Sequence, residues 1–307
     1  MQKRQIGTSE LYVSEIGLGC MSLGKDQKQA TVIINEAVDR GINYFDTADL
    51  YDFGLNEELV GNAIKRKRNE LILATKVGNR WENGQDGWYW DPSKKHIQRA
   101  VKDSLRRLQT DYIDLYQLHG GTIEDHIDET IDAFEELKKE GVIRYYGISS
   151  IRPNVIREYI KKANIVSVMM QYSILDRRPE EEILALLEEH RISLIARGPL
   201  AKGLLTERSI EDAGARIQEK GYLNYSFAEL KDVIIKLKQE TSDRRLLTET
   251  AIQYCLYNKS VASVIPGASK IEQVIANSKA TFASPLTVEE FEKIQEISKA
   301  NTYEKHR

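Results

Sequence analysis

The chain has 307 residues, of which 41% are hydrophobic and 30% charged, a composition ordinary for a globular protein with enough apolar mass for a full core. Its formal charge of −3 gives no overall attraction to nucleic acid or to an anionic membrane, so we expect neither partner. The opening residues, MQKRQIGTSE, lack an apolar signal core, and no stretch approaches the roughly 18 apolar residues of a membrane span. Cys20 and Cys255 are far apart and have no metal-ligand spacing, which indicates core thiols, no metal site and a reducing compartment. We therefore expect a cytoplasmic protein.

An alternation of strand-like and helix-like segments follows an opening hairpin-like segment, QIGTSELYVS. Short apolar runs alternate with longer amphipathic runs, which is the pattern of a βαβα fold. The predicted strands are Glu15–Leu18, Tyr44–Asp46, Leu71–Lys76, Ile113–Leu118, Tyr145–Ser149, Val166–Gln171, Leu194–Ala196 and Val264–Pro266. Strands in this number, with helical crossovers, favour a closed (β/α)8 TIM barrel over a doubly wound sheet, and we assign residues 1–307 to one barrel domain.

The helix-like runs between these strands carry apolar residues at i, i+3 and i+4. Examples are ATVIINEAVDRG, SKKHIQRAVKDSLRRL, ETIDAFEELKKEG and PEEEILALLEEH. Residues Thr206–Arg244 break the rhythm as a long insertion between strands seven and eight, which begins polar and ends in the helix-like run AELKDVIIKLKQE. Insertions of this kind usually cover a site or are mobile. The Thr-x-x-Glu capping box TVEE predicts a last helix over Thr287–Ala300.

Four polar side chains stand where three successive predicted strands end. Asp46 closes the run INYFD, Tyr51 follows five residues later, Lys76 closes the run ELILATK, and His119 closes the run YIDLYQLH. Parallel-strand barrels build their active sites at the carboxyl ends of their strands. We therefore expect these four residues to form one catalytic site.

The four residue types suit carbonyl reduction by hydride, which leaves an oxyanion that must be protonated. A tyrosine, here Tyr51, donates this proton near neutral pH if a nearby ammonium lowers its pKa from about 10. We expect Lys76 to supply the charge, Asp46 to keep Lys76 protonated, and His119 to orient the carbonyl by a hydrogen bond.

The run GINYFDTADLYDFGLNEELVG, from Gly41 to Gly61, resembles the signature of the aldo-keto reductase family, and the four residues above occupy the family's tetrad positions. The resemblance extends from the opening hairpin to the Ile-Pro-Gly segment near residue 265. It implies an NADP(H)-dependent oxidoreductase that reduces aldehydes or ketones to alcohols, with NAD(H) as the alternative cofactor. The expected partner is a small carbonyl substrate, and the expected assembly is a monomer or a small homo-oligomer.

The sequence has no strand-to-helix G-x-G-x-x-G motif, so the cofactor phosphates must be held by late barrel loops and a helix N-terminus. The segment ARGPLAKGLL after strand seven offers the backbone of Gly198, Leu200 and Gly203 and the charge of Lys202. The segment IPGASKIEQVIANSKA after strand eight opens a helix, with free amides predicted at Gly267, Ala268 and Ser269. By the resemblance, the residues that hold the adenosine 2′-phosphate and adenine are Gly267, Ser269, Lys270, Gln273 and Asn277.

The family resemblance also assigns the nicotinamide contacts. Ser149 and Gln171 match the family's carboxamide partners, whereas Ser150 replaces a common asparagine. Arg197 stands where many members have a tyrosine that stacks on the nicotinamide; a guanidinium also stacks on flat rings. Its charge should disfavour the cationic oxidised ring, which predicts a preference for the reduced cofactor, unless Arg197 turns away to a carboxylate or to the pyrophosphate.

The sequence leaves the preferred cofactor and the substrate class open. Lys270 favours NADP(H), but Gln273 replaces the family's common arginine, so dual use stays open. Trp81 and Trp88 belong to the aromatic run RWENGQDGWYWDP after Lys76, and either wall an apolar substrate pocket or anchor the loop. Aldehydes, ketones, dicarbonyls, sugars and steroids all stay open as substrates.

Two other classes compete with this interpretation. In an aldolase-type barrel Lys76 would form a Schiff base, which requires a neutral amine, and Asp46 argues against that state. A regulatory subunit that binds the cofactor with little turnover is the second alternative, since channel-associated relatives of the family keep its fold.

Overall fold

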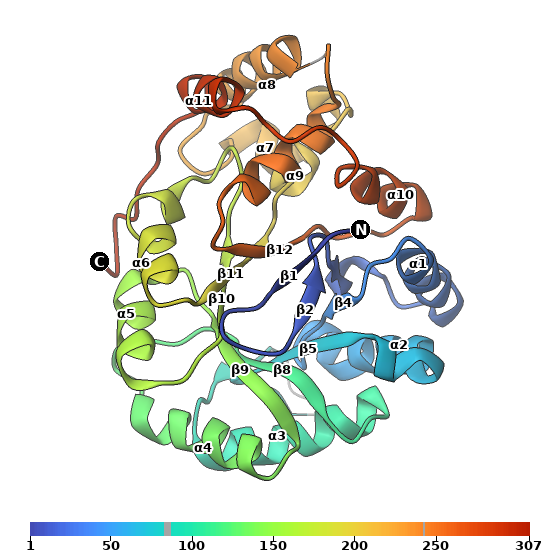
Figure 1. Cartoon of the computed structure of the whole chain (residues 1–307), viewed down its shortest axis with the longest axis vertical. Coiled ribbons are helices and arrows are strands. Elements are labelled where there is room, and N and C mark those ends of the chain that lie inside the picture. Colours follow the sequence, from blue (N-terminus) through green and yellow to red (C-terminus); the bar gives the residue numbers. More distant parts are fainter. Residues whose placement is uncertain (83–86, 242) are drawn as a thin grey trace.

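The computed structural model describes residues 1–82, 87–241 and 243–307. Within this part of the chain, eight strands form one parallel sheet in the order β3-β4-β5-β8-β9-β10-β11-β12, and helices surround it (Figure 1). The strands are β3 (Leu18–Gly19), β4 (Tyr44–Asp46), β5 (Ile72–Val77), β8 (Ile113–Leu118), β9 (Ile143–Ser149), β10 (Ser167–Gln171), β11 (Ser193–Arg197) and β12 (Val261–Ile265). The α-helices are α1 (Gln27–Asp39), α2 (Leu55–Ile64), α3 (Lys94–Leu108), α4 (Ile127–Lys139), α5 (Pro153–Lys162), α6 (Ile183–Glu189), α7 (Ala215–Lys220), α8 (Phe227–Thr241), α9 (Leu247–Tyr257), α10 (Ile271–Lys279) and α11 (Val288–Ile297).

The first and last strands of this sheet meet and close the barrel. Gly17 donates its amide to the carbonyl of Val264 at 2.9 Å, and Val264 donates to the carbonyl of Glu15 at 2.8 Å. The predicted (β/α)8 barrel is therefore confirmed. The bounds of β4 and β8 are as predicted, and those of the other six strands differ. The largest differences are in β3, where regular pairing begins only at Leu18, and in β12, which already begins at Val261.

The predicted N-terminal hairpin closes one end of the barrel. β1 (Lys3–Gln5) pairs antiparallel with β2 (Tyr12–Ser14), and both strands lie across the barrel in Figure 1. Ile6, Leu11 and Val13 are buried in one cluster with side chains from the barrel strands, such as Leu115 and Met169. Because apolar side chains fill this end, a ligand must approach from the opposite end, where the strands have their carboxyl termini.

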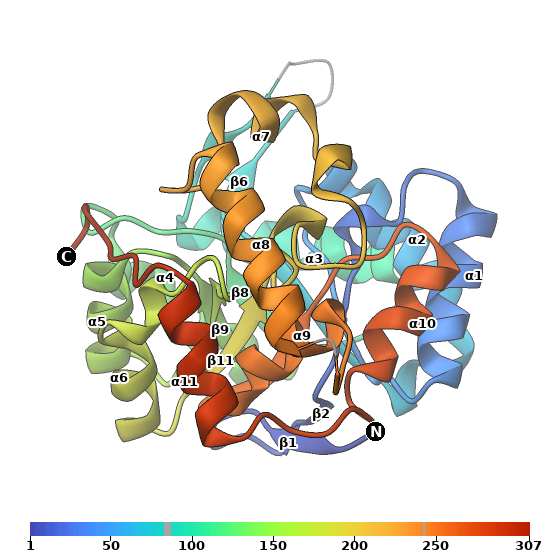
Figure 2. The same ribbon diagram turned by 90° about the horizontal axis from the view of Figure 1, so that it is seen from above.

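The insertion lies at that opposite end. After β11 the chain forms short 3-10 helices at Ala201–Gly203 and Ile210–Asp212, then α7 and α8, before α9 returns to the barrel wall. Figure 2 shows α7 and β1 at opposite ends of the molecule. The predicted insertion is present and ends in a helix as expected; residue 242 within it lies outside the described residues.

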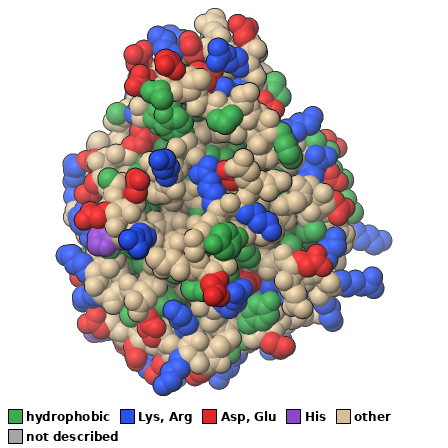
Figure 3. Space-filling view, in the orientation of Figure 1, with side chains coloured by type: hydrophobic (Ala, Val, Ile, Leu, Met, Phe, Trp, Pro, Cys, Tyr) green, Lys and Arg blue, Asp and Glu red, His purple; other side chains and the backbone are tan. Residues whose placement is uncertain are grey.

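The remaining expectations concern the last helix, the surface and the thiols. The capping box holds α11, because Thr287 and Glu290 exchange hydrogen bonds of 2.9 and 3.2 Å. Positive and negative side chains lie interspersed on the face shown in Figure 3. Both cysteines are buried and free, and none of the described helices is long and apolar enough to cross a membrane.

Candidate active site

Three neighbouring strands bring the four predicted catalytic residues together. Asp46 ends β4, Lys76 lies one residue before the end of β5, and His119 directly follows β8. β5 pairs with β4 on one side and with β8 on the other. Tyr51 begins a 3-10 helix (Tyr51–Gly54) that follows β4 and returns its side chain toward Lys76.

The Lys76 ammonium joins this group. Its Nζ lies 2.5 Å from Oδ1 of Asp46, 2.7 Å from the carbonyl of Thr47 and 3.3 Å from the hydroxyl of Tyr51. Both Lys76 and Asp46 are buried, and the second oxygen of Asp46 accepts a hydrogen bond of 3.2 Å from Gln117. The three N–H groups of the ammonium therefore have three acceptors, one of which is the candidate acid.

Burial raises the pKa of Asp46, with Lys76 and Gln117 acting against it. Burial also acts to lower the pKa of Lys76, but Asp46 and Tyr51 outweigh it and raise that pKa. The first shift favours a neutral acid and the second a charged amine. We assign the ionic form of the pair, because an ammonium with a full set of acceptors is better satisfied than a neutral amine.

His119 stands edge-on to Tyr51, with ring centroids 5.8 Å apart and planes at 83°. Burial, helped by the charges of Lys76 and Arg197, lowers the pKa of His119 to about 3. Its buried Nδ1 has no hydrogen-bond partner among the described residues. The imidazole is therefore neutral at physiological pH, with one ring nitrogen buried and unpaired.

The backbone after Tyr51 turns sharply through three left-handed residues, Asp52 (φ 48°), Phe53 (φ 53°) and Gly54 (φ 90°). The φ of Gly54 favours glycine, and a Cβ there would lie 2.8 Å from Cδ of Arg107, so that side chain would have to move. Non-glycine residues at positive φ cost free energy and concentrate at functional sites. The turn places Phe53 beside Trp81, with ring centroids 6.0 Å apart.

The predicted aromatic substrate wall is divided in the structure. Trp81 and Phe53 line a cavity of about 570 Å³ together with Asp49 and several charged side chains. Trp88 has 55% of its surface exposed in the arm formed by β6 (Asn79–Arg80) and β7 (Tyr89–Trp90), a hairpin that the sequence interpretation missed; residues 83–86 of this run lie outside the described residues. Trp90 anchors the arm by donating to Asp125 at 3.0 Å.

A further carboxyl group lies close to this site. Asp49 is buried, and neither of its carboxyl oxygens has a hydrogen-bond partner in the described part of the chain. Burial, with Glu57 next in importance, raises the pKa of Asp49 well above its usual value. No spacing in the sequence shows that the carboxyl oxygens of Asp49 are unpaired in the described part of the chain.

The ends of β10 and β11 carry the predicted nicotinamide contacts. Gln171 and Arg197 are directly paired in the parallel register, and Nη1 of Arg197 donates to Oε1 of Gln171 at 3.1 Å. The Nε2 of Gln171 donates to the hydroxyl of Tyr222, a residue of the insertion, at 3.0 Å. Ser149 ends β9, while Ser150 caps the following turn by accepting from the amide of Arg152.

The segment after β11 presents backbone rather than bulky side chains. Gly198 and Gly203 have φ values of 66° and 87°, and Lys202 is exposed at φ 61°. Leu200 lies half-buried against the main core. Open glycine backbone with a nearby exposed lysine suits a pyrophosphate.

The segment after β12 corrects one expectation. The amide of Ser269 is not free, because it donates to Oε1 of Gln273 at 2.7 Å, and the amide of Lys270 donates to the same oxygen at 3.2 Å. Gln273 therefore caps the N-terminus of α10. Gly267 and Lys270 are exposed, whereas Asn277 is buried.

Taken residue by residue, this edge of the barrel fits a nicotinamide dinucleotide. Glycines at positive φ open the backbone after β11, an exposed lysine stands at the start of α10, and an amide side chain ends β10. These groups and the tetrad share the carboxyl end of one parallel sheet. A ligand with phosphates at one end and a carboxamide at the other would find complementary groups along this edge.

Comparison with known proteins agrees with this geometry. Residues 15–299 match the Aldo/keto reductase family. The uncharacterized oxidoreductase YqkF of Bacillus subtilis (strain 168) is 61% identical over 307 residues, which cover 100% of both proteins. The NADH-specific methylglyoxal reductase of Escherichia coli (strain K12) is 32% identical over 90% of this chain and 92% of that protein. The holo form of aldo-keto reductase AKR11C1 from Bacillus halodurans superposes with a TM-score of 0.94 at 61% identity, covering 100% of this chain and 99% of that one. The chain therefore belongs to the aldo/keto reductase family of oxidoreductases, which use nicotinamide cofactors.

Proposed function

We propose that the protein reduces aldehydes or ketones to alcohols with NADPH and that Tyr51 donates the proton. The observation that carries this proposal is the buried ammonium of Lys76, which contacts Asp46 at 2.5 Å and the Tyr51 hydroxyl at 3.3 Å. An ammonium beside a phenol stabilises the phenolate that proton transfer leaves behind.

The reaction needs a hydride at the carbonyl carbon, which a reduced nicotinamide supplies when it is bound. As negative charge develops on the carbonyl oxygen, the Tyr51 hydroxyl donates its proton to that oxygen. Lys76 stabilises the resulting phenolate, and Asp46 keeps Lys76 charged and in place. The neutral imidazole of His119, beside the Tyr51 ring, orients the carbonyl by a hydrogen bond.

The aldolase alternative requires a neutral Lys76 as nucleophile. The raised pKa of Lys76 and its three acceptors oppose that state. A Schiff-base mechanism is therefore not the function we propose.

The direct test is the loss of reduced-nicotinamide absorbance with NADPH or NADH and a panel of aldehydes, ketones and dicarbonyls. Removing a positioned general acid costs roughly 100- to 10,000-fold in rate, so Tyr51→Phe should lose turnover by about that factor while keeping cofactor affinity. The control is Tyr12→Phe, at an exposed tyrosine on the closed end of the barrel. A wild type that binds cofactor but turns over none of the panel would overturn the proposal in favour of a regulatory subunit.

For the cofactor we propose NADP(H), with NAD(H) as the alternative. Lys270 is exposed at the start of α10, where it supplies a positive charge for a 2′-phosphate, but Gln273 serves as a helix cap. Removing an exposed charge contact should weaken NADPH binding about two- to fivefold in Lys270→Ala and leave NADH unchanged. Lys279→Ala, at the other end of α10, is the control, and equal losses for both cofactors would exclude 2′-phosphate recognition by Lys270.

A further inference from the structure

The amide of Gln171 is held by two side chains from different parts of the chain. Arg197, its partner in the sheet register, donates to Oε1 at 3.1 Å. Tyr222, from the connection between α7 and α8, accepts from Nε2 at 3.0 Å. The barrel thus supplies one contact and the insertion supplies the other.

These two contacts fix which way the amide faces. A guanidinium only donates hydrogen bonds, so it must face the oxygen of Gln171 and not the nitrogen. The nitrogen then faces the hydroxyl of Tyr222. Each end keeps spare capacity, because Nε2 carries a second N–H and Oε1 a second lone pair.

We propose that Tyr222 is a positioning residue which, together with Arg197, sets the Gln171 amide to pair with the nicotinamide carboxamide. The inference rests on the proposed function, in which Gln171 contacts that group. A primary carboxamide offers an N–H and a carbonyl side by side, which complement the spare lone pair and N–H of Gln171. A reversed Gln171 amide would place its N–H against the N–H of the carboxamide and its oxygen against the carboxamide oxygen, so neither hydrogen bond could form.

Tyr222 is suited to this role because its hydroxyl stays protonated. Burial, with Asp176 next in importance, raises the pKa of Tyr222 to about 12. The hydroxyl therefore accepts from Gln171 as a neutral group throughout the physiological pH range.

A tight turn fixes the position of Tyr222. Tyr222 and Tyr225 exchange two backbone hydrogen bonds, each 3.0 Å long. Gly221 enters this turn at φ 74°, and a Cβ there would lie 1.9 Å from the carbonyl oxygen of Tyr225. Only glycine fits at that position, and the two backbone hydrogen bonds hold the turn closed.

The segment after α11 holds the turn from outside. The amide of Lys299 donates to the hydroxyl of Tyr225 at 2.5 Å, and the Lys299 ammonium donates to the carbonyl of Asn224 at 2.8 Å. The same ammonium pairs with Glu229 in α8 at 2.7 Å. The insertion is thereby fastened to the last part of the chain.

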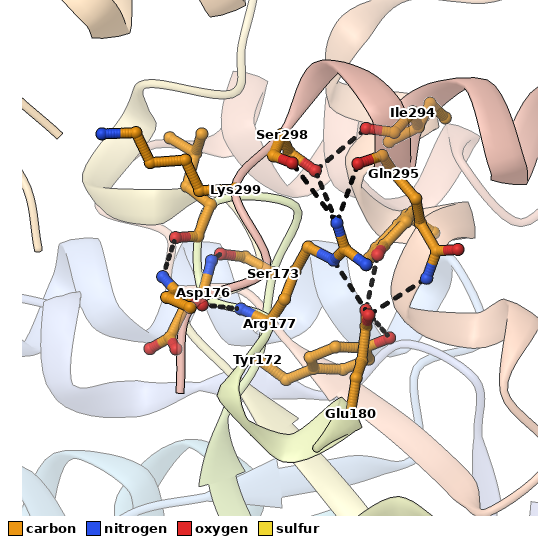
Figure 4. A network of polar contacts seen from close by, with 12 residues as sticks. Tyr172, Ser173, Asp176, Arg177, Glu180, Ile294, Gln295, Ser298 and Lys299 are labelled. Atoms are coloured by element: carbon orange, nitrogen blue, oxygen red, sulfur yellow. Dashed lines mark hydrogen bonds and ion pairs between the residues drawn. The ribbon is translucent and has the colours of Figure 1, made fainter. Parts of the chain in front are cut away.

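A polar network fastens that last part to the barrel (Figure 4). Arg177, six residues after Gln171, donates to the carbonyl of Gln295 at 2.9 Å. Glu180 accepts from Arg177 at 2.9 Å and from Gln295 at 3.0 Å. A continuous series of contacts therefore runs from the barrel through α11 and the segment after it to the turn that carries Tyr222.

The test measures binding and needs no substrate. Dissociation constants are measured by calorimetry for NADPH and for 2′-phospho-ADP-ribose, which lacks the nicotinamide ring. Loss of one hydrogen bond of ordinary strength predicts about three- to tenfold weaker NADPH binding in Tyr222→Phe, with affinity for the ring-free fragment unchanged. In a Gln171→Leu background the same substitution should have no further effect, since both would act through one amide.

The matched control is Tyr303→Phe, at a tyrosine that is also buried and whose hydroxyl has no partner among the described residues. It should change neither affinity. Equal weakening of both probes by Tyr222→Phe would show a general structural role and overturn the inference, as would no change in either. A wild type that binds neither NADPH nor NADH would instead overturn the proposed function itself.

Discussion

The two sides of the site are assembled in different ways. Asp46 and Lys76 meet because their strands are neighbours in the sheet, and both side chains are buried. Gln171 and Arg197 are also strand neighbours, but their half-buried side chains take a third contact from the insertion. The side that would transfer the proton is thus set by barrel strands and the short connection after β4, whereas the side that would hold the nicotinamide also depends on the long insertion.

The substitution Lys76→Met tests the buried pair of Asp46 and Lys76 and has the largest expected effect. Removing one partner of a buried ion pair leaves Asp46 uncompensated and typically costs about 3–5 kcal/mol. Urea unfolding should show this loss, together with loss of turnover. The double variant Asp46→Asn with Lys76→Met removes both charges and should be more stable than the single variant; equal stability of the two would mean that the pair is not ionised.

The substitution Asp49→Asn tests whether the buried carboxyl of Asp49 lowers the free energy of unfolding. The raised pKa of Asp49 means that its contribution is favourable below the unfolded-state pKa of about 3.9 and is lost as the pH rises toward the folded-state value. Asparagine cannot ionise, so the variant should be more stable by roughly 1–2 kcal/mol at pH 8, with the difference vanishing near pH 4.

Unfolding at several pH values measures this difference. Asp111→Asn, at an exposed aspartate, serves as the control and should follow the wild type. A pH-independent difference between wild type and Asp49→Asn would show that the Asp49 carboxyl does not ionise differently in the folded state.

The substitution Arg197→Tyr tests the side of the site that would hold the nicotinamide and has the smallest expected effect. Two like charges about 6 Å apart in water-like surroundings repel by about 0.7 kcal/mol, or about threefold in affinity. The ratio of NADP⁺ to NADPH dissociation constants should therefore fall about threefold in the variant. An unchanged ratio would exclude a charge effect of Arg197 on the nicotinamide, and Arg216→Tyr in α7 is the control.

The two sides of the site also differ in how much of them could be predicted from the sequence. Residues that end strands were predictable, because strand ends in a parallel barrel share one edge, and Asp46, Tyr51, Lys76 and His119 do lie together. Tyr222 was missed, since nothing in the sequence relates a residue of a long insertion to Gln171 fifty-one positions earlier. Its only local signal is Gly221 before two tyrosines three residues apart, which is typical of a tight turn.

The cap on α10 was missed for a different reason. Gln273 follows Lys270 by three residues, the spacing at which a glutamine side chain returns to the start of a helix. The family resemblance assigned Gln273 to the binding of the adenosine 2′-phosphate and adenine, and its capping role was not predicted. The amide of Ser269 was expected to be free because the first N–H groups of a helix lack partners within the helix, but it is already bonded to Gln273.

The hairpin of β1 and β2 allows stability and activity to be changed by substitutions in different parts of the molecule. Its buried side chains fill the end of the barrel opposite the tetrad, so substitutions there act on folding without reaching the reacting groups. Directed evolution could therefore select for thermal tolerance in a library of hairpin variants and for substrate range in a separate library of variants at the opposite end. Improved variants from the two libraries could then be combined, because distant sites contribute additively to stability.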